Sequence, residues 1–290
     1  MYYFFIIISS LLFSLNFFSK KIFQSNAGVG VRMTFITSFI TSFITSIVSA
    51  ICMLFIGKLH VEFNLFSLGL DFVYTVNSFL ITYCTLKSFE SANLSVYTLF
   101  IMLGSIVLPS AFGIIFYNEP FSWSKIVCYL LIFAALLLTV DYGEKSNKKA
   151  YKYYIFVFLM NGLAGIICKI HQSSDAAVDT NSFLLINAVM SGLISLGILL
   201  MDFKKSFAEV KKVNSVAFWA VVIGAAVGAI GNFLNVDAVR VVPISIHSII
   251  TTGGTILFSV IIGLTQKERL SAKNVVSVVI AIAAAVVSVL

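Results

Sequence analysis

Apolar residues along this chain gather into ten runs, and short polar gaps separate one run from the next. The fifth run is the shortest, and it reaches the spanning length of about 17–25 residues if it begins near Trp123. No run has the strict alternation of a transmembrane β-strand. The pattern predicts an all-α integral membrane protein with ten transmembrane helices. They are Tyr2–Phe18, Met33–Ile56, Leu68–Leu86, Leu94–Tyr117, Ile126–Val140, Tyr153–Ile170, Phe183–Met201, Val216–Val236, Pro243–Leu264 and Val275–Leu290.

The composition supports a bilayer environment, because 60% of the residues are hydrophobic and only 11% are charged. The excess of positive charge lies in the gaps, where Lys and Arg act as topology signals, so we expect no nucleic-acid partner. The four cysteines are far apart, and no histidine accompanies them at metal-ligand spacing. We therefore expect neither a metal ion nor another cofactor.

The second half of the chain repeats the first at a spacing of about 150 residues. The segment Ser95-Val96-Tyr97-Thr98 matches Ser245-Ile246-His247-Ser248, and Gly104 matches Gly254. Matched glycines and polar residues in an apolar background are hard to obtain by chance. The sequence therefore predicts two copies of one helical unit.

These copies comprise residues 1–141 and 153–290, joined by a basic linker at 142–152. Each copy has five predicted helices, an odd number, so the second copy enters the membrane with the opposite orientation. Such inverted repeats place a solute site near the middle of the membrane, between the repeats. Transport by alternating access is the natural use of this architecture.

Short motifs recur around the fourth and fifth helices of each half. They are Tyr83-Cys84-Thr85-Leu86 and Asn118-Glu119-Pro120-Phe121-Ser122 in the first half, and Asp237-Ala238, Pro243 and Lys267-Glu268-Arg269-Leu270-Ser271 in the second. Together they resemble the EamA-type repeat of the drug/metabolite transporter superfamily. The resemblance implies a ten-helix transporter, often an exporter, with a central cavity lined by helices one, three, four, six, eight and nine. It also implies a structural role for Glu119 and Glu268, whose charge complements a helix start.

Polar side chains at membrane depth are costly, so each is a candidate for contact with a solute. His247 is repeat-related to Tyr97 and can take up a proton near neutral pH, which makes it the proton-coupling candidate. A bond from its ring to a neighbouring carbonyl is the alternative. For each remaining candidate alone, a hydrogen bond between helices is the favoured interpretation. Taken as a set, these residues are expected to converge on one cavity. The predicted solute-binding residues are Asn16, Asn77, Ser78, Thr82, Tyr97, Asn161, Asn232, Asn235 and His247.

Charged residues near the helices give two further expectations. Asp71, Glu90 and Asp237 sit near the ends of predicted helices, so we expect no buried carboxylate that exchanges a cation for a proton. Lys21 and Lys169 occupy matching positions near the ends of the first and sixth helices. Their side chains are expected to extend to the lipid headgroups, with attraction of an anionic solute as the alternative.

Two patterns of small residues concern helix packing. The tetrapeptide Phe-Ile-Thr-Ser occurs three times from Phe35 to Ser46, and we expect its hydroxyls to bond to the preceding turn rather than to line a solute path. In the eighth helix, Ala220, Gly224 and Gly228 recur at every fourth position. Such a face allows another helix to approach closely.

These observations predict a secondary transporter that moves a small polar or amphipathic metabolite, or a drug, across the cytoplasmic membrane by alternating access. Export and coupling to protons are part of this prediction. The alternative is a flippase, or a flippase subunit, for a lipid-linked sugar. An enzyme is not expected, because His60, His171 and His247 lie in separate segments and form no catalytic constellation. The expected partners are a small solute and the lipid bilayer, and both a monomer and a homodimer fit the sequence.

The orientation of the chain has two opposing indications. The odd-numbered gaps hold fifteen of the nineteen Lys and Arg residues, which places both termini outside by the positive-inside rule. The family resemblance places both termini in the cytoplasm instead.

Overall fold

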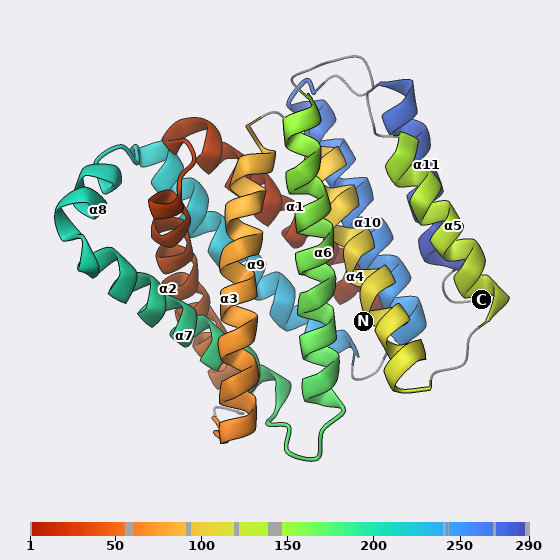
Figure 1. Ribbon diagram of the computed structural model, residues 1–290, viewed down its shortest axis with the longest axis horizontal. Coiled ribbons are helices and arrows are strands. Elements are labelled where there is room, and N and C mark those ends of the chain that lie inside the picture. The colour runs from red at the N-terminus through yellow and green to blue at the C-terminus, as the bar shows by residue number, and fades with distance from the viewer. Residues whose placement is uncertain are drawn as a thin grey trace.

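The computed structural model describes residues 2–55, 61–90, 94–118, 122–138, 147–239, 242, 244–268 and 271–287, and these residues contain helices but no β-strand (Figure 1). The helices of this described part are α1 (Tyr2–Ala27), α2 (Val31–Phe55), α3 (Leu65–Ser88), α4 (Leu94–Phe116), α5 (Trp123–Leu138), α6 (Asn147–Gln172), α7 (Thr180–Met201), α8 (Phe203–Val210), α9 (Ser215–Val239), α10 (Ile244–Thr265) and α11 (Ala272–Val287).

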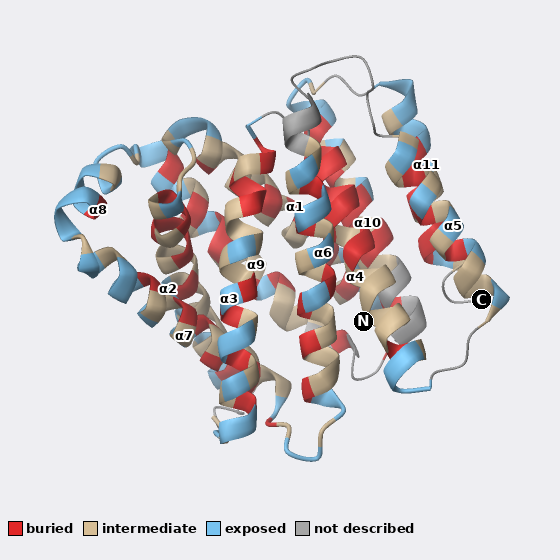
Figure 2. Ribbon diagram, in the orientation of Figure 1, coloured by how far each residue is buried: buried red, intermediate tan, exposed pale blue. Residues whose placement is uncertain are grey.

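Seven of the described helices, α1 to α4, α6, α7 and α9, contain stretches long and apolar enough to cross a membrane. α5, α10 and α11 contribute shorter apolar stretches. Large apolar side chains such as Phe43, Leu130 and Leu193 are exposed, and exposed positions recur along the helices (Figure 2). In a bilayer such side chains contact lipid instead of water. The chain is therefore a multi-pass membrane protein.

The helix boundaries differ from the predicted ones at three places that matter. α1 runs to Ala27, nine residues beyond the predicted end, because residues such as Lys20 have high helix propensity even where hydropathy falls. α6 begins at Asn147, inside the predicted linker 142–152. The short amphipathic α8 fills the gap between α7 and α9, where no helix was predicted.

The largest contacts join helices from opposite halves of the chain. α1 packs along α9 and α10, and α6 packs along α3 and α4. α2 packs against α7 and α9, while α5 pairs with α11. Figure 1 shows the α5–α11 pair at one edge of the bundle and α8 at the opposite edge. The two halves therefore interlock and do not form separate bodies.

Two glycines allow helices to pack closely. A Cβ atom on Gly104 of α4 would overlap the backbone of Phe158 in α6. A Cβ atom on Gly254 of α10 would lie 3.0 Å from the Cβ atom of Ser10 in α1. Any larger side chain at Gly104 must push α4 away from α6, because a backbone cannot rotate aside as a side chain can.

The small-residue face predicted for the eighth helix is confirmed in α9. A Cβ atom on Gly224 would meet the side chain of Ser19, and one on Gly228 would meet that of Asn16. Asn16 also donates a hydrogen bond from Nδ2 to the carbonyl oxygen of Gly224, at 2.7 Å. α1 and α9 therefore touch along the face that the spacing of small residues indicates.

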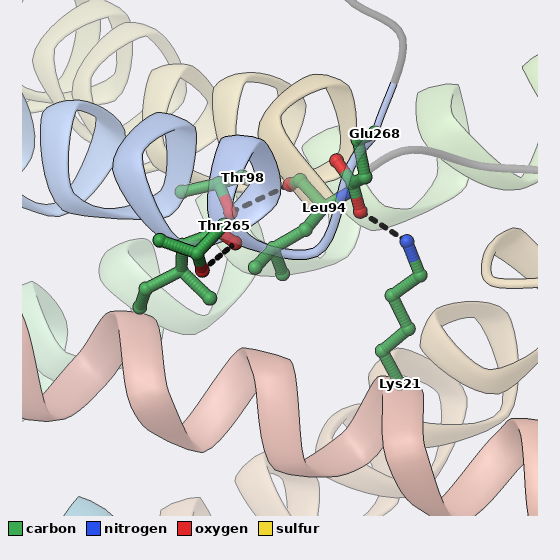
Figure 3. Close-up of polar contacts among 6 residues, drawn as sticks. Lys21, Leu94, Thr98, Thr265 and Glu268 are labelled. Carbon is green, nitrogen blue, oxygen red and sulfur yellow. Dashed lines mark hydrogen bonds and ion pairs between the residues drawn. The ribbon is translucent and has the colours of Figure 1, made fainter.

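The Glu268 carboxylate, in the turn after α10, joins three helices (Figure 3). It forms an ion pair with the ammonium group of Lys21 in α1 and accepts bonds from the Leu94 backbone N–H, at 3.1 Å to each oxygen. Leu94 is the first residue of α4, so the carboxylate complements the positive end of that helix. Glu268 thus contacts a helix start, as expected, but that helix is α4 and not the helix that follows Glu268; Lys21 is paired to it, and Glu119 lies outside the described residues.

Replacing Gly104 tests the contact between α4 and α6. We expect Gly104→Ala to lower the free energy of unfolding by about 1–3 kcal/mol, because overpacking forces the backbones apart. The matched control is Gly197→Ala in α7, where a new Cβ atom meets no heavy atom within 4 Å. Denaturation of the purified protein by sodium dodecyl sulfate compares the two, and equal stability of both variants would contradict the proposed packing.

The ion pair between Lys21 and Glu268 is open to a double-mutant cycle. Glu268 has 7% of its side chain exposed, so loss of either partner leaves a poorly solvated charge. We expect Lys21→Met and Glu268→Gln each to destabilise the protein, with a coupling of about 0.5–3 kcal/mol between them. The same cycle on the exposed pair of Lys212 and Glu209 should give a coupling near zero. Equal coupling in both cycles would disprove the special role of Glu268.

Candidate functional site

A cavity of about 270 Å³ lies between α2, α3, α7 and α9, and Lys20 of α1 also contributes to its wall. Hydroxyl and amide side chains make up most of the lining. Lys20 is the one charged residue among the described lining residues. The cavity therefore offers many hydrogen-bonding groups and a single positive charge.

The helices that line the cavity correct the expectation drawn from the family resemblance. α2 and α7 supply much of the wall, whereas α4, α6 and α10 supply no described lining residue. These helices pack closely instead, because α4 contacts α6 at Gly104 and α10 contacts α1 at Gly254.

The repeated Phe-Ile-Thr-Ser segment of α2 forms one wall of the cavity. A four-residue repeat drifts by about 40° per repeat on a 3.6-residue helix, so Thr37, Thr41 and Thr45 stay on one face. Thr37 donates to a carbonyl of the preceding turn at 2.8 Å, as expected for the whole stripe. Thr41 and Thr45 line the cavity, and the buried hydroxyl of Ser38 has no hydrogen-bond partner in the described part of the chain. The stripe thus faces the cavity, while Thr37 and Ser46 also donate to carbonyls of the preceding turn, as expected.

The other walls bring polar groups from three helices towards this stripe. Tyr74, Ser78 and Thr82 recur every fourth residue along α3. Asn232 comes from α9, and Asn187 of α7 donates a hydrogen bond to the Thr75 hydroxyl at 2.9 Å. Three of the nine predicted solute-binding residues, Ser78, Thr82 and Asn232, therefore lie together in the lining.

Four other predicted residues, all asparagines, lie outside the lining and form hydrogen bonds between helices. Three donate from Nδ2 to backbone carbonyls: Asn16 to Gly224, Asn77 to Met160 at 2.9 Å and Asn161 to Ile101 at 2.7 Å. Asn235 accepts a bond from the Thr251 hydroxyl at 3.2 Å. An unsatisfied amide is expensive within a membrane, which accounts for these contacts.

The repeat-related pair of Tyr97 and His247 also lies outside the cavity lining. Tyr97 is fully buried; its hydroxyl bonds to that of Thr85 at 2.9 Å, and its ring contacts those of Phe17 and Phe89. His247 is buried, and its Nε2 atom has no hydrogen-bond partner among the described residues.

α3 also carries a buried carboxylate that is not part of the cavity lining. Asp71 is fully buried, six residues after the start of α3, and neither carboxylate oxygen has a partner among the described residues. Tyr74 of the cavity wall and the thiol of Cys168 in α6 interact with it electrostatically. The Nε2 atom of His171, in α6, lies 3.0 Å from the Ser67 hydroxyl, one turn before Asp71. A carboxylate is therefore buried within α3, although it lies outside the cavity lining.

No protein-family model matches the chain, and no curated protein matches it in sequence. The argument for function therefore depends on the cavity, its surroundings and the internal repeat.

Proposed function

We propose that this chain is a secondary transporter with ten membrane-spanning helices, built as two inverted five-helix repeats, that moves a small polar metabolite by alternating access. The first repeat comprises α1 to α5, and the second comprises α6, α7, α9, α10 and α11. The observation that carries the proposal is the position of the cavity, which lies between two pairs of helices, α2 with α7 and α3 with α9, that are equivalent in the two repeats.

The pattern of helix contacts supports the repeat. Exchange of the two halves turns the contact of α1 with α9 into that of α6 with α3, and both contacts exist. The same exchange turns the contact of α1 with α10 into that of α6 with α4, which also exists. The pairs α2–α7, α4–α10 and α5–α11 map onto themselves, as pairs on a two-fold axis must.

Individual residues support the same relation. Gly104 contacts Phe158, and its repeat partner Gly254 contacts Ser10. Ser10 and Phe158 are 148 residues apart in the sequence, which is the separation of the matched pair Lys21 and Lys169. The same close contact therefore occurs twice, once with its glycine in the first half and once with its glycine in the second half.

The middle of the cavity supports a position on the pseudo-two-fold axis. Ser42 of α2 lines the cavity and is 150 residues before Gly192 of α7. A Cβ atom on Gly192 would lie 3.5 Å from the Cβ atom of Ser42. Equivalent residues can meet in this way only at the axis that relates the repeats, and inverted-repeat transporters bind their solutes there.

The size and lining of the cavity favour a metabolite over a lipid-linked sugar. About 270 Å³ is slightly below the usual range of small-molecule sites, and most residues of the wall carry a hydroxyl or amide group. The proposal also includes membership of the EamA-type transporters, export, and location in the cytoplasmic membrane. These three parts of the proposal are based on the sequence motifs.

Blocking the cavity tests the proposal directly. Thr45 lines the cavity, whereas Ile47, two residues later in α2, has 43% of its surface exposed. Purified protein in liposomes is screened for flux of amino acids, sugars, nucleobases and organic acids. We expect Thr45→Trp to abolish the flux found, because the indole fills the solute space, and Ile47→Trp to leave it unchanged. Absence of flux for every solute class would contradict the proposed function.

Coupling to protons has two candidate residues. The sequence indicates His247, and the buried carboxylate of Asp71, next to Tyr74 of the cavity wall, is the second. We expect Asp71→Asn to lose uphill accumulation under an imposed proton gradient but to keep downhill flux, because the amide cannot exchange a proton. His247→Gln is the parallel variant, and its loss of uphill transport alone would assign coupling to His247. Full retention in both variants would exclude proton coupling at either residue.

A further inference from the structure

We infer that the cavity takes a small organic anion, a carboxylate or a phosphate ester, whose charge is held by Lys20. This inference rests on the proposed function and names the class of solute that the cavity selects.

The two consecutive lysines of α1 have different surroundings. Successive residues of a helix are about 100° apart, so Lys20 and Lys21 face different neighbours. Lys21 is neutralised by the Glu268 carboxylate. Lys20 lies in the cavity wall, where no carboxylate of the described residues is within ion-pair distance, and its ammonium group lies 6.0 Å from the centre of the Phe17 ring. Lys20 is thus a cation in the cavity wall that has no counter-ion among the described residues.

The position of Lys20 makes an uncompensated charge costly. It lies seven residues before the end of α1, or about 10 Å along the helix axis. Its side chain also borders a narrow crevice between α1 and α9, together with Thr41 and Gly224. A charge held between helices is typical of a solute pathway, because a partner is needed to offset its desolvation. An anionic solute supplies that partner.

The remaining lining suits an oxyanion. Thr41 of α2 is next to Lys20 in both the cavity and the crevice, and the Ser38 hydroxyl, one turn earlier, has no protein partner among the described residues. Thr82 and Asn232 add further possible donors from α3 and α9. Hydrogen bonds to a charged acceptor are about twice as strong as those between neutral groups.

Negative charge near the cavity does not cancel this preference. Among the described residues, the acidic Asp71 interacts with Tyr74 of the wall but is not part of the lining. The volume of about 270 Å³ exceeds the need of a simple inorganic ion by several-fold, since one water molecule takes about 30 Å³ of liquid. The cavity therefore has room for the carbon and hydroxyl groups of an organic anion.

Matched pairs of probes test the inference. Glycerol 3-phosphate is compared with glycerol, and gluconate with sorbitol, by thermal stabilisation of the purified protein and by flux into phosphatidylcholine liposomes. We expect at least one anion to bind and its neutral counterpart not to bind. Lys20→Gln should weaken binding of that anion about ten- to a hundredfold, the usual loss for one hydrogen bond to a charged group. Lys20→Arg should retain it.

The matched control is Lys204→Gln, a lysine exposed on α8, which should bind the anion as the wild type does. Equal binding of anion and neutral counterpart, no binding of either anion, or full binding by Lys20→Gln would overturn the inference. Loss of probe binding on addition of phosphatidylglycerol would assign the site to a lipid headgroup and would also overturn it.

The two proposals fail in different ways. Flux of neutral solutes that is indifferent to Lys20 would refute the anion site and leave transport standing. Lys20-dependent binding of an anion without flux of any solute would refute transport and leave the anion site standing.

Discussion

Within a bilayer, a polar group that finds no partner inside the protein has no water to replace it, and the described structure follows from this constraint. The Glu268 carboxylate meets it by binding Lys21 and the first N–H of α4, which fixes α1, α4 and the end of α10 together. Asn16, Asn77 and Asn161 meet it by donating to carbonyls of other helices. These bonds fix the positions of the helices relative to one another, whereas apolar contacts alone would allow the helices to slide.

Some of the groups that do not meet this constraint lie at or near the cavity, whereas others, such as His247 Nε2 and the Ser259 hydroxyl, lie elsewhere. Lys20 has no counter-ion among the described residues, the Ser38 hydroxyl has no partner, and both are in the cavity wall. Asp71 has two unpaired oxygens and lies one turn from Tyr74 of the same wall. A membrane protein retains unsatisfied polar groups at a cost, which makes those at the cavity wall candidates for contact with the proposed solute.

The sequence predicts the features that depend on local pattern. It does not predict the features that depend on which helix packs against a given face. Runs of apolar residues locate the spanning helices, and the spacing of Gly224 and Gly228 indicates the face of α9 that α1 covers. The sequence does not reveal which face of α2 meets α7, so the hydroxyl stripe was assigned to backbone bonds. It misses Lys20 because hydropathy ends α1 too early, and it misjudges Asp71 because α3 begins before the apolar run. Both errors come from equating a helix with its hydrophobic part.

The proposed repeat is symmetric in its helix contacts but not in its charged residues. At the spacing of the matched pair Lys21 and Lys169, the counterpart of Lys20 is Cys168; at a spacing of 150, that of Asp71 is Val221. The helix contacts are therefore duplicated, whereas both ionisable groups near the cavity come from the first half. A symmetric scaffold makes the inward-open and outward-open arrangements similar in energy. In the proposed transport cycle, charges present in one half alone make the same solute interact differently with the two arrangements, and only such differential binding gives the cycle a preferred state.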